Sequence, residues 1–481
     1  MAPPTLAGTP EFIVMKRFAA LLVLLAPMFL LLGCAGTANN SNIQNNQPGA
    51  VFVTGEDAPV SSVVAFNITI NSITLNNGTT SVPALSTPTA VDFGRLVGLR
   101  SLLAFNSVPA GTYESATFTF ETANPAPVIS YVDVSATPPA VNTLTGTLSQ
   151  ATVTVPFPAG SALVVGSNGL VGLHIDFNLR DSLVVDGNNQ MTGAINPVMA
   201  VQAVSAADDL GQITEFTGNI VSVNASGNSF VMQGPYGFQE TIDVNTSTLY
   251  NGSNSLSTLM VNGIASVIGT VQADGSILAS GVELISTNEA FISGRVLAVN
   301  PTSGPVQTVT MWVGEELGTS GIIPVDTVQT IGLNLVSTYD VCFFDNLLTQ
   351  QVFNDSSLVV GQRIFIGGST AGGLFTPQMV SLRRQGVVGA LVQNSVTVTG
   401  GTGSNLGYFQ MQNDALMSYA AGGPFTVLTG DKTFFVNING LAGLQQAGTP
   451  NLISRGLVFK NPANGEPVVV AGRVRVLPAG Q

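Results

Sequence analysis

The residue types that could do chemistry are few in this sequence, and the single histidine is the first to consider. His174 lies near Asp176 and Arg180 at multiples of two residues, with apolar residues in between. Because side chains two apart on a strand share a face, these three polar groups would lie together. They could form a ligand-binding or acid–base patch. Alternation alone also places polar residues on the solvated face of a half-buried strand, and the pattern favours that interpretation.

The signatures of catalysis and metal binding are missing from the sequence. A serine nucleophile would have to use His174, yet no Gly-x-Ser-x-Gly motif occurs. One histidine and one available cysteine cannot supply a usual four-ligand zinc site. Calcium needs only oxygen ligands, but the acidic stretches lack the spaced Asp-x-Asp-x-Asp-Gly pattern. These stretches are Asp186-Gly187-Asn188-Asn189, Asp208-Asp209 and Glu315-Glu316. We interpret the first as a hairpin turn and the second as a domain junction, and expect no catalytic, metal-binding or cofactor-binding residue.

The two cysteines lie in different surroundings. Cys342 belongs to the apolar run Val341-Cys342-Phe343-Phe344, far in sequence from the histidine that a nucleophilic thiol would need. We therefore expect it to be a buried, unreactive thiol. Cys34 follows Leu31, Leu32 and Gly33 at the end of an apolar stretch that opens with Met15-Lys16-Arg17.

The segment before Cys34 resembles the lipobox of bacterial lipoproteins. A transmembrane anchor is the first alternative, but about fifteen apolar residues fall short of the roughly 20 that a spanning helix needs. A plain secretory signal is the second, and it would more often end in an Ala-x-Ala-like site. The resemblance implies a signal peptide at residues 1–33, with 1–14 a mis-called start. It also implies a signal-peptidase motif at Leu31, Leu32 and Gly33, and lipid attachment at Cys34.

Residues 34–50 would then form the lipidated N-terminus and a flexible tether. The resemblance implies a protein anchored in the bacterial cell envelope. Ala35 follows the cysteine where inner-membrane lipoproteins often have Asp, which favours the outer membrane or the cell surface over the inner membrane.

The composition is that of a β-rich surface protein. Charged residues make up 9% of the 481 residues, the hydrophobic fraction is 45% and glycine occurs 53 times. This apolar content is too high for a disordered chain, and the length suits about three or more domains. The formal net charge is −13 and the 14 Lys and Arg are scattered. Such a field repels polyanions, so we expect no nucleic acid partner.

Residues 51–207 predict an antiparallel β-sandwich, because short alternating strands are separated by Gly, Pro and Asn turns. The region 51–205 resembles a bacterial domain family of unknown function that is common at the start of lipoproteins. The matching pieces are Glu56-Asp57-Ala58-Pro59, Val108-Pro109-Ala110-Gly111-Thr112-Tyr113, a strand from Leu173 to Leu183, and Asn196-Pro197-Val198. The family has no agreed activity, so the resemblance implies a fold and no mechanism.

Residues 211–481 repeat a pattern. The Gly-led segment 218–224 aligns with 294–300, and 389–394 is a weaker third copy. About five strands and a short helical turn in each copy predict small barrels of the oligonucleotide/oligosaccharide-binding type, at 211–287, 288–385 and 386–481. These modules resemble tandem copies of a second bacterial family of unknown function, and the third departs most from its pattern.

The sequence therefore predicts an all-β, lipid-anchored envelope protein with a non-catalytic binding or structural role. The membrane, through Cys34, and a glycan or another envelope protein are the expected partners. The alternative is an enzyme that acts on an envelope or extracellular polysaccharide with carboxylates alone, which would need two carboxyl groups roughly 5–10 Å apart in a cleft.

Overall fold

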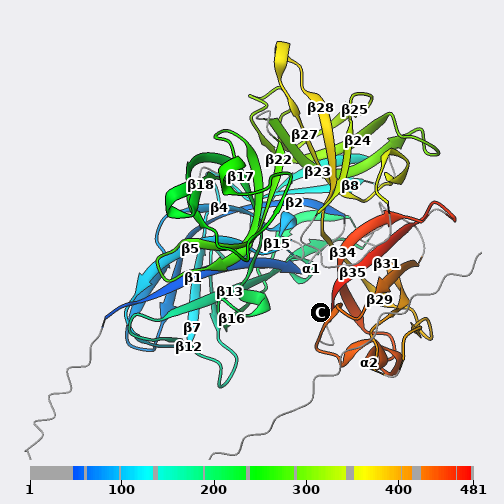
Figure 1. Ribbon diagram of the computed structural model, residues 1–481. Helices are drawn as coiled ribbons and strands as arrows, with labels where there is room; N and C mark the ends of the chain where they lie inside the picture. The colour runs from blue at the N-terminus through cyan, green and yellow to red at the C-terminus, as the bar shows by residue number, and fades with distance from the viewer. Residues whose placement is uncertain are drawn as a thin grey trace, which may run out of the picture. The chain divides into compact units, whose positions relative to one another are not determined.

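Almost all of the regular structure in this protein is β-strand (Figure 1). Residues 46–481 form one compact unit, and every contact given below belongs to it. The computed structural model describes residues 47–58, 62–96, 99–133, 139–187, 190–234, 239–286, 290–342, 352–401, 403–413, 424–461 and 463–477. The predictions for residues 1–33 and for Cys34 lie outside the described residues.

The first domain contains two main sheets with a shared core. One sheet has the order β16-β13-β1-β5, with β1 (Gly49–Ala58), β5 (Ser101–Val108), β13 (Leu170–Asn178) and β16 (Met199–Val204). The other has the order β11-β7-β2-β8-β9, with β2 (Val63–Asn76), β7 (Ser115–Phe120), β8 (Val128–Asp133), β9 (Ala140–Thr145) and β11 (Thr152–Pro156). β3 (Ser81–Leu85) and β4 (Thr89–Asp92) also pair with β2.

Two small sheets complete this domain. β6 (Gly111–Tyr113) pairs with β12 (Leu163–Val165), and β15 (Met191–Ile195) lies between β10 (Thr147–Leu148) and β14 (Leu183–Val185). The turn between β14 and β15 begins at Asp186, whose Oδ1 accepts the Gln190 N–H, so the hairpin predicted there is confirmed.

Alternating apolar residues build the core between the main sheets. Along β7, Phe118 and Phe120 are buried and the threonines beside them are more exposed, as the period of two predicts. The ring of Phe177 on β13 packs against those of Phe66, Phe93 and Phe120. Such aromatic pairs bury large areas and hold the two sheets together.

Two details of the first domain differ from the sequence prediction. β1 runs parallel to β13, so this sheet is mixed although its other pairings are antiparallel. The strand predicted from Leu173 to Leu183 ends at Asn178, whose side chain accepts the Asp181 N–H and begins the short helix α1 (Leu179–Ser182). Asn is a favoured helix N-cap, which explains the break.

The second part of the chain contains a closed barrel. Its strands are β17 (Ile213–Asn224), β18 (Ser229–Gln233), β19 (Gln239–Asp243), β20 (Leu249–Asn251), β21 (Ile264–Val271) and β22 (Ile277–Ser286). The pairing runs β17-β18-β19-β22-β21 and returns to β17, with β19 parallel to β22. The short helix η4 (Leu256–Thr258) precedes β21, which is the fourth of the ring's five strands in chain order. This arrangement matches the predicted five-stranded barrel of the oligonucleotide/oligosaccharide-binding type.

The remaining two sheets repeat this pairing order with variations. The third part contains β23 (Ala290–Asn300), β24 (Thr308–Leu317), β25 (Thr327–Gly332), β26 (Thr338–Val341), β27 (Arg363–Ser369) and β28 (Thr376–Leu382), in the order β25-β24-β23-β27-β28-β26. Among its described residues, β25 does not pair with β28, so this ring stays open.

The fourth part closes again. It contains β29 (Gln385–Leu391), β30 (Thr397–Val398), β31 (Gly407–Asn413), β32 (Phe425–Thr429), β33 (Phe434–Val436), α2 (Gly440–Gln446), β34 (Asn451–Lys460) and β35 (Pro467–Val476). The ring runs β29-β31-β32-β35-β34 and returns to β29, and α2 precedes β34, the fourth of these strands in chain order.

The glycine that leads each repeat has the same structural role in all three sheets. A Cβ on Gly218, Gly294 or Gly389 would overlap a carbonyl oxygen of the neighbouring strand, at Gln233, Trp312 and Gln412 respectively. Only glycine allows the two backbones to approach so closely. Whether the three parts are copies of one family, and whether they are separate domains with the predicted bounds, stays a prediction. In the part of the chain that the structure describes, no helix is both long and apolar enough to cross a membrane.

Candidate functional site

His174 does not lie on a solvated face, and the sequence prediction for it is wrong. Its side chain is only 3% exposed, its Nδ1 lies 3.1 Å from Thr54 Oγ1, and its Nε2 lies 3.8 Å from Glu56 Oε2. Thr54 and Glu56 belong to β1, which lies beside β13 with Thr54 opposite His174. The polar faces of the two strands form one surface, and other elements cover it. Alternation along a strand predicts on which face of the sheet a side chain lies. It does not predict whether another part of the chain packs over that face.

The groups around His174 form what we call the His174 cluster: Glu56, Arg100, His174, Asp209 and Arg473. Oε2 of Glu56 lies 3.6 Å from Arg100 Nη1, and Oε1 of Glu56 lies 3.7 Å from Arg473 Nη1. Oδ1 of Asp209 lies 3.2 Å from Arg100 Nη2, and Oδ2 of Asp209 lies 3.1 Å from Arg473 Nη2. Asp209 belongs to η2 (Asp209–Gly211), which connects the first domain to the first barrel, and Arg473 belongs to β35. The cluster therefore joins the first domain, the connecting segment and the fourth part of the chain.

Burial and charge together set the protonation states in the His174 cluster. Burial alone would raise the pKa of Glu56, but attraction to Arg100 and Arg473 outweighs it and lowers this pKa to about 2. Burial lowers the pKa of His174 to about 4, and the attraction of Glu56 only partly opposes this. At neutral pH the cluster thus holds a carboxylate and a neutral imidazole. A histidine with this pKa is a poor general base near neutral pH.

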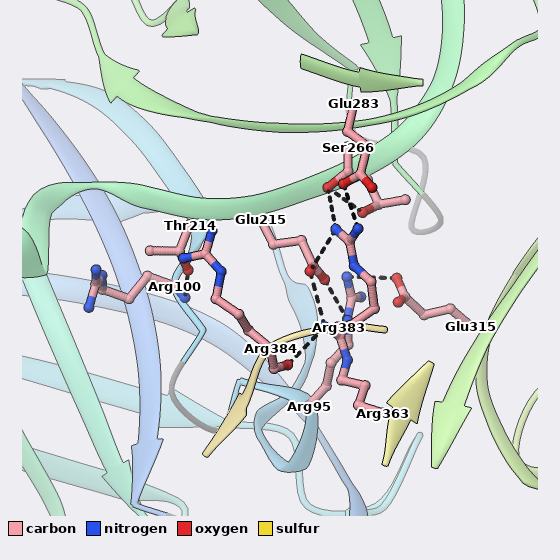
Figure 2. A network of polar contacts seen from close by, with 11 residues as sticks. Arg95, Arg100, Thr214, Glu215, Ser266, Glu283, Glu315, Arg363, Arg383 and Arg384 are labelled. Carbon is pink, nitrogen blue, oxygen red and sulfur yellow. Dashed lines mark hydrogen bonds and ion pairs between the residues drawn. The ribbon is translucent and has the colours of Figure 1, made fainter. Parts of the chain in front are cut away.

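A second buried network, the Glu215 cluster, comprises Arg95, Glu215, Glu283, Glu315, Arg363 and Arg383 (Figure 2). Glu215 on β17 accepts hydrogen bonds from Arg363 Nη1 at 3.0 Å and Nη2 at 2.5 Å, a bidentate pair. Its Oε2 also accepts a bond from Arg383 Nη2 at 3.3 Å, and Arg383 Nη1 donates to Glu283 Oε2 at 2.5 Å.

The Glu215 cluster joins the first domain, the first barrel and the third part of the chain. Glu215 and Glu283 come from the first barrel, and Arg363 and Arg383 come from the third part of the chain; all four residues are at most 5% exposed. Arg95, in η1 (Phe93–Arg95) of the first domain, lies 2.6 Å from Glu315 on β24. Burial would raise the pKa of Glu215, but the two guanidinium groups outweigh it and hold the pKa well below its usual range. A carboxylate fixed in this way cannot serve as a general acid at neutral pH.

Two carboxyl groups with raised pKa values line a cleft between the first domain and the first barrel. The cleft has a volume of about 60 Å³, and its lining includes Asp92, Arg95, Glu215 and Glu240. Burial raises the pKa of Asp92 to about 6, although a hydrogen bond from the Phe66 N–H opposes this rise. Burial also raises the pKa of Glu240 to about 7. Carboxyl groups with raised pKa values in a cleft are candidate functional groups.

The acidic stretches considered for calcium have other roles. Asp209 is paired with two arginines, and Asp208 Oδ2 accepts the Ser205 N–H in the turn between domains. Glu316 Oε2 accepts hydrogen bonds from the N–H and hydroxyl of Thr319. Within the described residues, no three His, Cys, Asp or Glu side chains gather closely enough to hold a metal ion.

The remaining candidates are mostly buried. Cys342 is 4% exposed in an apolar core cluster, so its predicted burial is confirmed. Trp312 is 3% exposed and packs against Val64 and Val132 of the first domain. Phe343 and Phe344 lie outside the described residues.

Sequence reasoning missed both charge clusters, although a signal was present. The chain has few cationic residues, and several of them interrupt apolar strands. Arg363 directly precedes Ile-Phe-Ile, and Arg473 directly precedes Val-Arg-Val. Charged side chains are rarely buried unless they are paired, so a charge inside an apolar run indicates a buried ion pair. The partner cannot be read from the sequence, because Glu215 and Arg363 are 148 residues apart.

Comparison with known proteins assigns a family to one region of the chain. No match to a curated protein was found. Residues 49–192 match the family described as a domain of unknown function, DUF4382. The match ends before β16, although β16 pairs with β13 in the same sheet, so the structural domain extends beyond the matched residues. In agreement with the resemblance seen in the sequence, the first domain contains a DUF4382 domain of unknown function at residues 49–192.

Proposed function

We propose that this chain is a lipid-anchored protein of the bacterial cell envelope with a non-catalytic binding or structural role. The lipobox-like segment ending at Cys34 supports the anchor. The β-rich body, which follows a short polar segment, would be presented at the membrane surface. A glycan or another envelope protein remains the expected partner, and a nucleic acid is disfavoured by the net charge of −13.

One observation carries the proposal: the charged side chains are committed to junctions. His174, Glu215 and Glu315, which could have acted as acids or bases, each lie against arginines or other groups from a distant part of the chain. Pairing of this kind fixes side chains and holds the four parts of the body against one another. It supports a role in presenting a rigid surface more than a role in bond cleavage.

Incubation of the purified full-length chain with defined envelope polysaccharides, and separately with an extract of envelope proteins, tests this proposal. We expect a polysaccharide or an envelope protein to be retained intact on the immobilised chain, with no increase in reducing ends. Failure to retain any envelope component at high protein concentration would contradict a binding role, and a steady release of reducing ends would contradict a non-catalytic one.

The second candidate is an enzyme that uses carboxylates alone on a polysaccharide. The observation that favours it is the cleft with Asp92 and Glu240, whose pKa values are raised to about 6 and about 7. A carboxyl group with such a pKa can donate a proton near neutral pH. The small volume of the cleft, about 60 Å³, argues against a sugar ring there. Polysaccharide cleavage that disappears in Glu240→Gln would favour this candidate.

A further inference from the structure

The cleft between the first domain and the first barrel has an apolar wall. Leu96, Leu102 and Leu103 of the first domain face Phe216 of the barrel across it. Glu240 stands on the same face of β19 as Ile242, which is buried in the barrel core, so its side chain lies at the end of the barrel interior. A volume of about 60 Å³ exceeds the roughly 10–15 Å³ that one water needs, so a small organic group fits.

Glu240 has no partner in this cleft. Within the described part of the chain, its side chain makes no hydrogen bond or ion pair, and burial is the sole cause of its raised pKa. A partly buried carboxyl group without a donor carries a desolvation cost that a bound cation or donor would relieve. The group is therefore available to a ligand in a way that the clustered carboxylates are not.

The charges that line the cleft favour a cation over an anion. Arg95 lies 2.6 Å from Glu315, and Glu215 is held by Arg363. Within the described residues, neither Asp92 nor Glu240 forms an ion pair, although the nearby charge of Arg95 partly opposes the rise in the pKa of Asp92. The negative charge of the whole chain adds to the same preference.

We infer that this cleft binds a small organic cation, an alkylammonium group whose charged head pairs with Glu240 and whose apolar part lies against Leu102 and Phe216. The inference goes beyond the envelope role proposed above and does not depend on the anchor at Cys34. Pockets with an apolar lining and a few placed polar groups, at domain interfaces and in the mouths of barrels, are common ligand sites.

Three probes with the same apolar part separate the head group from the tail: butylammonium, 1-butanol and butyrate. Calorimetric titration of the full-length chain near pH 7 should give an affinity for butylammonium about fivefold higher than for 1-butanol, which corresponds to one ion pair of about 1 kcal/mol. Butyrate should bind most weakly. Binding of the ammonium should release about half a proton, measured in two buffers of different ionisation enthalpy, because the pKa of Glu240 is about 7.

Two matched variants show whether Glu240 causes the preference for butylammonium. Glu240→Gln keeps the size of the side chain and should remove both the preference for butylammonium and the proton release. Glu466→Gln, at an exposed carboxylate outside the cleft, should change neither. Equal affinity for the three probes would overturn the inference, as would no binding of butylammonium at tens of millimolar or a preference that survives in Glu240→Gln. A cooperative thermal transition with a midpoint no lower than that of the parent verifies that each variant is folded.

Discussion

Acidification should weaken the fold through His174, and the size of the effect follows from its surroundings. The imidazole is 3% exposed, and burial lowers its pKa from about 6.5 to about 4. The charged groups that face it are Glu56 on β1, Arg100, and Arg473 and Arg475 on β35. Because the folded-state pKa is the lower one, the unfolded chain binds more protons between these two values. The contribution of His174 to the free energy of unfolding is therefore complete above about pH 6.5 and is lost as the pH falls toward about 4.

The expected loss can be worked out from these two pKa values. Between about pH 7.5 and about pH 5, the His174 contribution to the free energy of unfolding should fall by about 2 kcal/mol. Glu56 contributes little in this range, because its lowered pKa of about 2 affects stability only below about pH 4.5. The pKa values of Asp92 and Glu240 are raised in the folded protein, so these two groups make the fold more stable as the pH falls. The effect of His174 is therefore measured as the difference between the parent chain and a variant without this histidine.

His174→Gln is the matched variant, since glutamine can still hydrogen-bond Thr54 but does not titrate. Urea unfolding, followed by far-ultraviolet circular dichroism and by the fluorescence of Trp312, the single tryptophan, gives the free energy at each pH. The parent chain should lose about 2 kcal/mol more than the variant on going from about pH 7.5 to about pH 5. The same pH dependence in both chains would refute the reasoning and would mean that His174 is charged or solvated in the folded protein.

Two further predictions follow from the buried groups. Glu215→Gln should destabilise the fold by about 3 kcal/mol or more in urea unfolding, because two buried guanidinium groups lose their shared carboxylate, whereas Glu466→Gln at the surface should change it by less than about 0.5 kcal/mol. Equal effects would show that the pairing in the Glu215 cluster is not formed in solution. In a Cys34→Ser background, Cys342 should resist a thiol reagent until urea unfolds the chain, since its side chain is 4% exposed. Rapid labelling of the native chain would contradict its burial.

Local patterns in the sequence predict the strands and much of the fold class. Phe118 and Phe120 alternate with threonines, which is enough to predict a strand with one buried face. Gly218 and Gly294 mark the start of the repeats because a side chain there would overlap the next strand. These features depend on residues close in sequence or on a repeated local geometry, so one sequence suffices.

The charge clusters depend on contacts that no local pattern encodes. Glu56 meets Arg473 from the far end of the chain, and His174 is covered as a result of that packing. The alternation around His174 is correct, but solvation of its face does not follow from it. The cleft at Glu240 is also a product of packing, since its walls come from the first domain and the first barrel.

The most direct test of the proposed function is the chemical state of Cys34 in the protein purified from membranes. Mass spectrometry of the N-terminal peptide should find Cys34 as the first residue, with a diacylglyceryl group on its sulfur and, in most lineages, an acyl group on its amine. Cys34→Ser should abolish processing and acyl labelling and should release the chain from the membrane. An N-terminus upstream of Cys34, or an unmodified Cys34 in membrane-bound protein, would contradict the account of a lipid-anchored envelope protein.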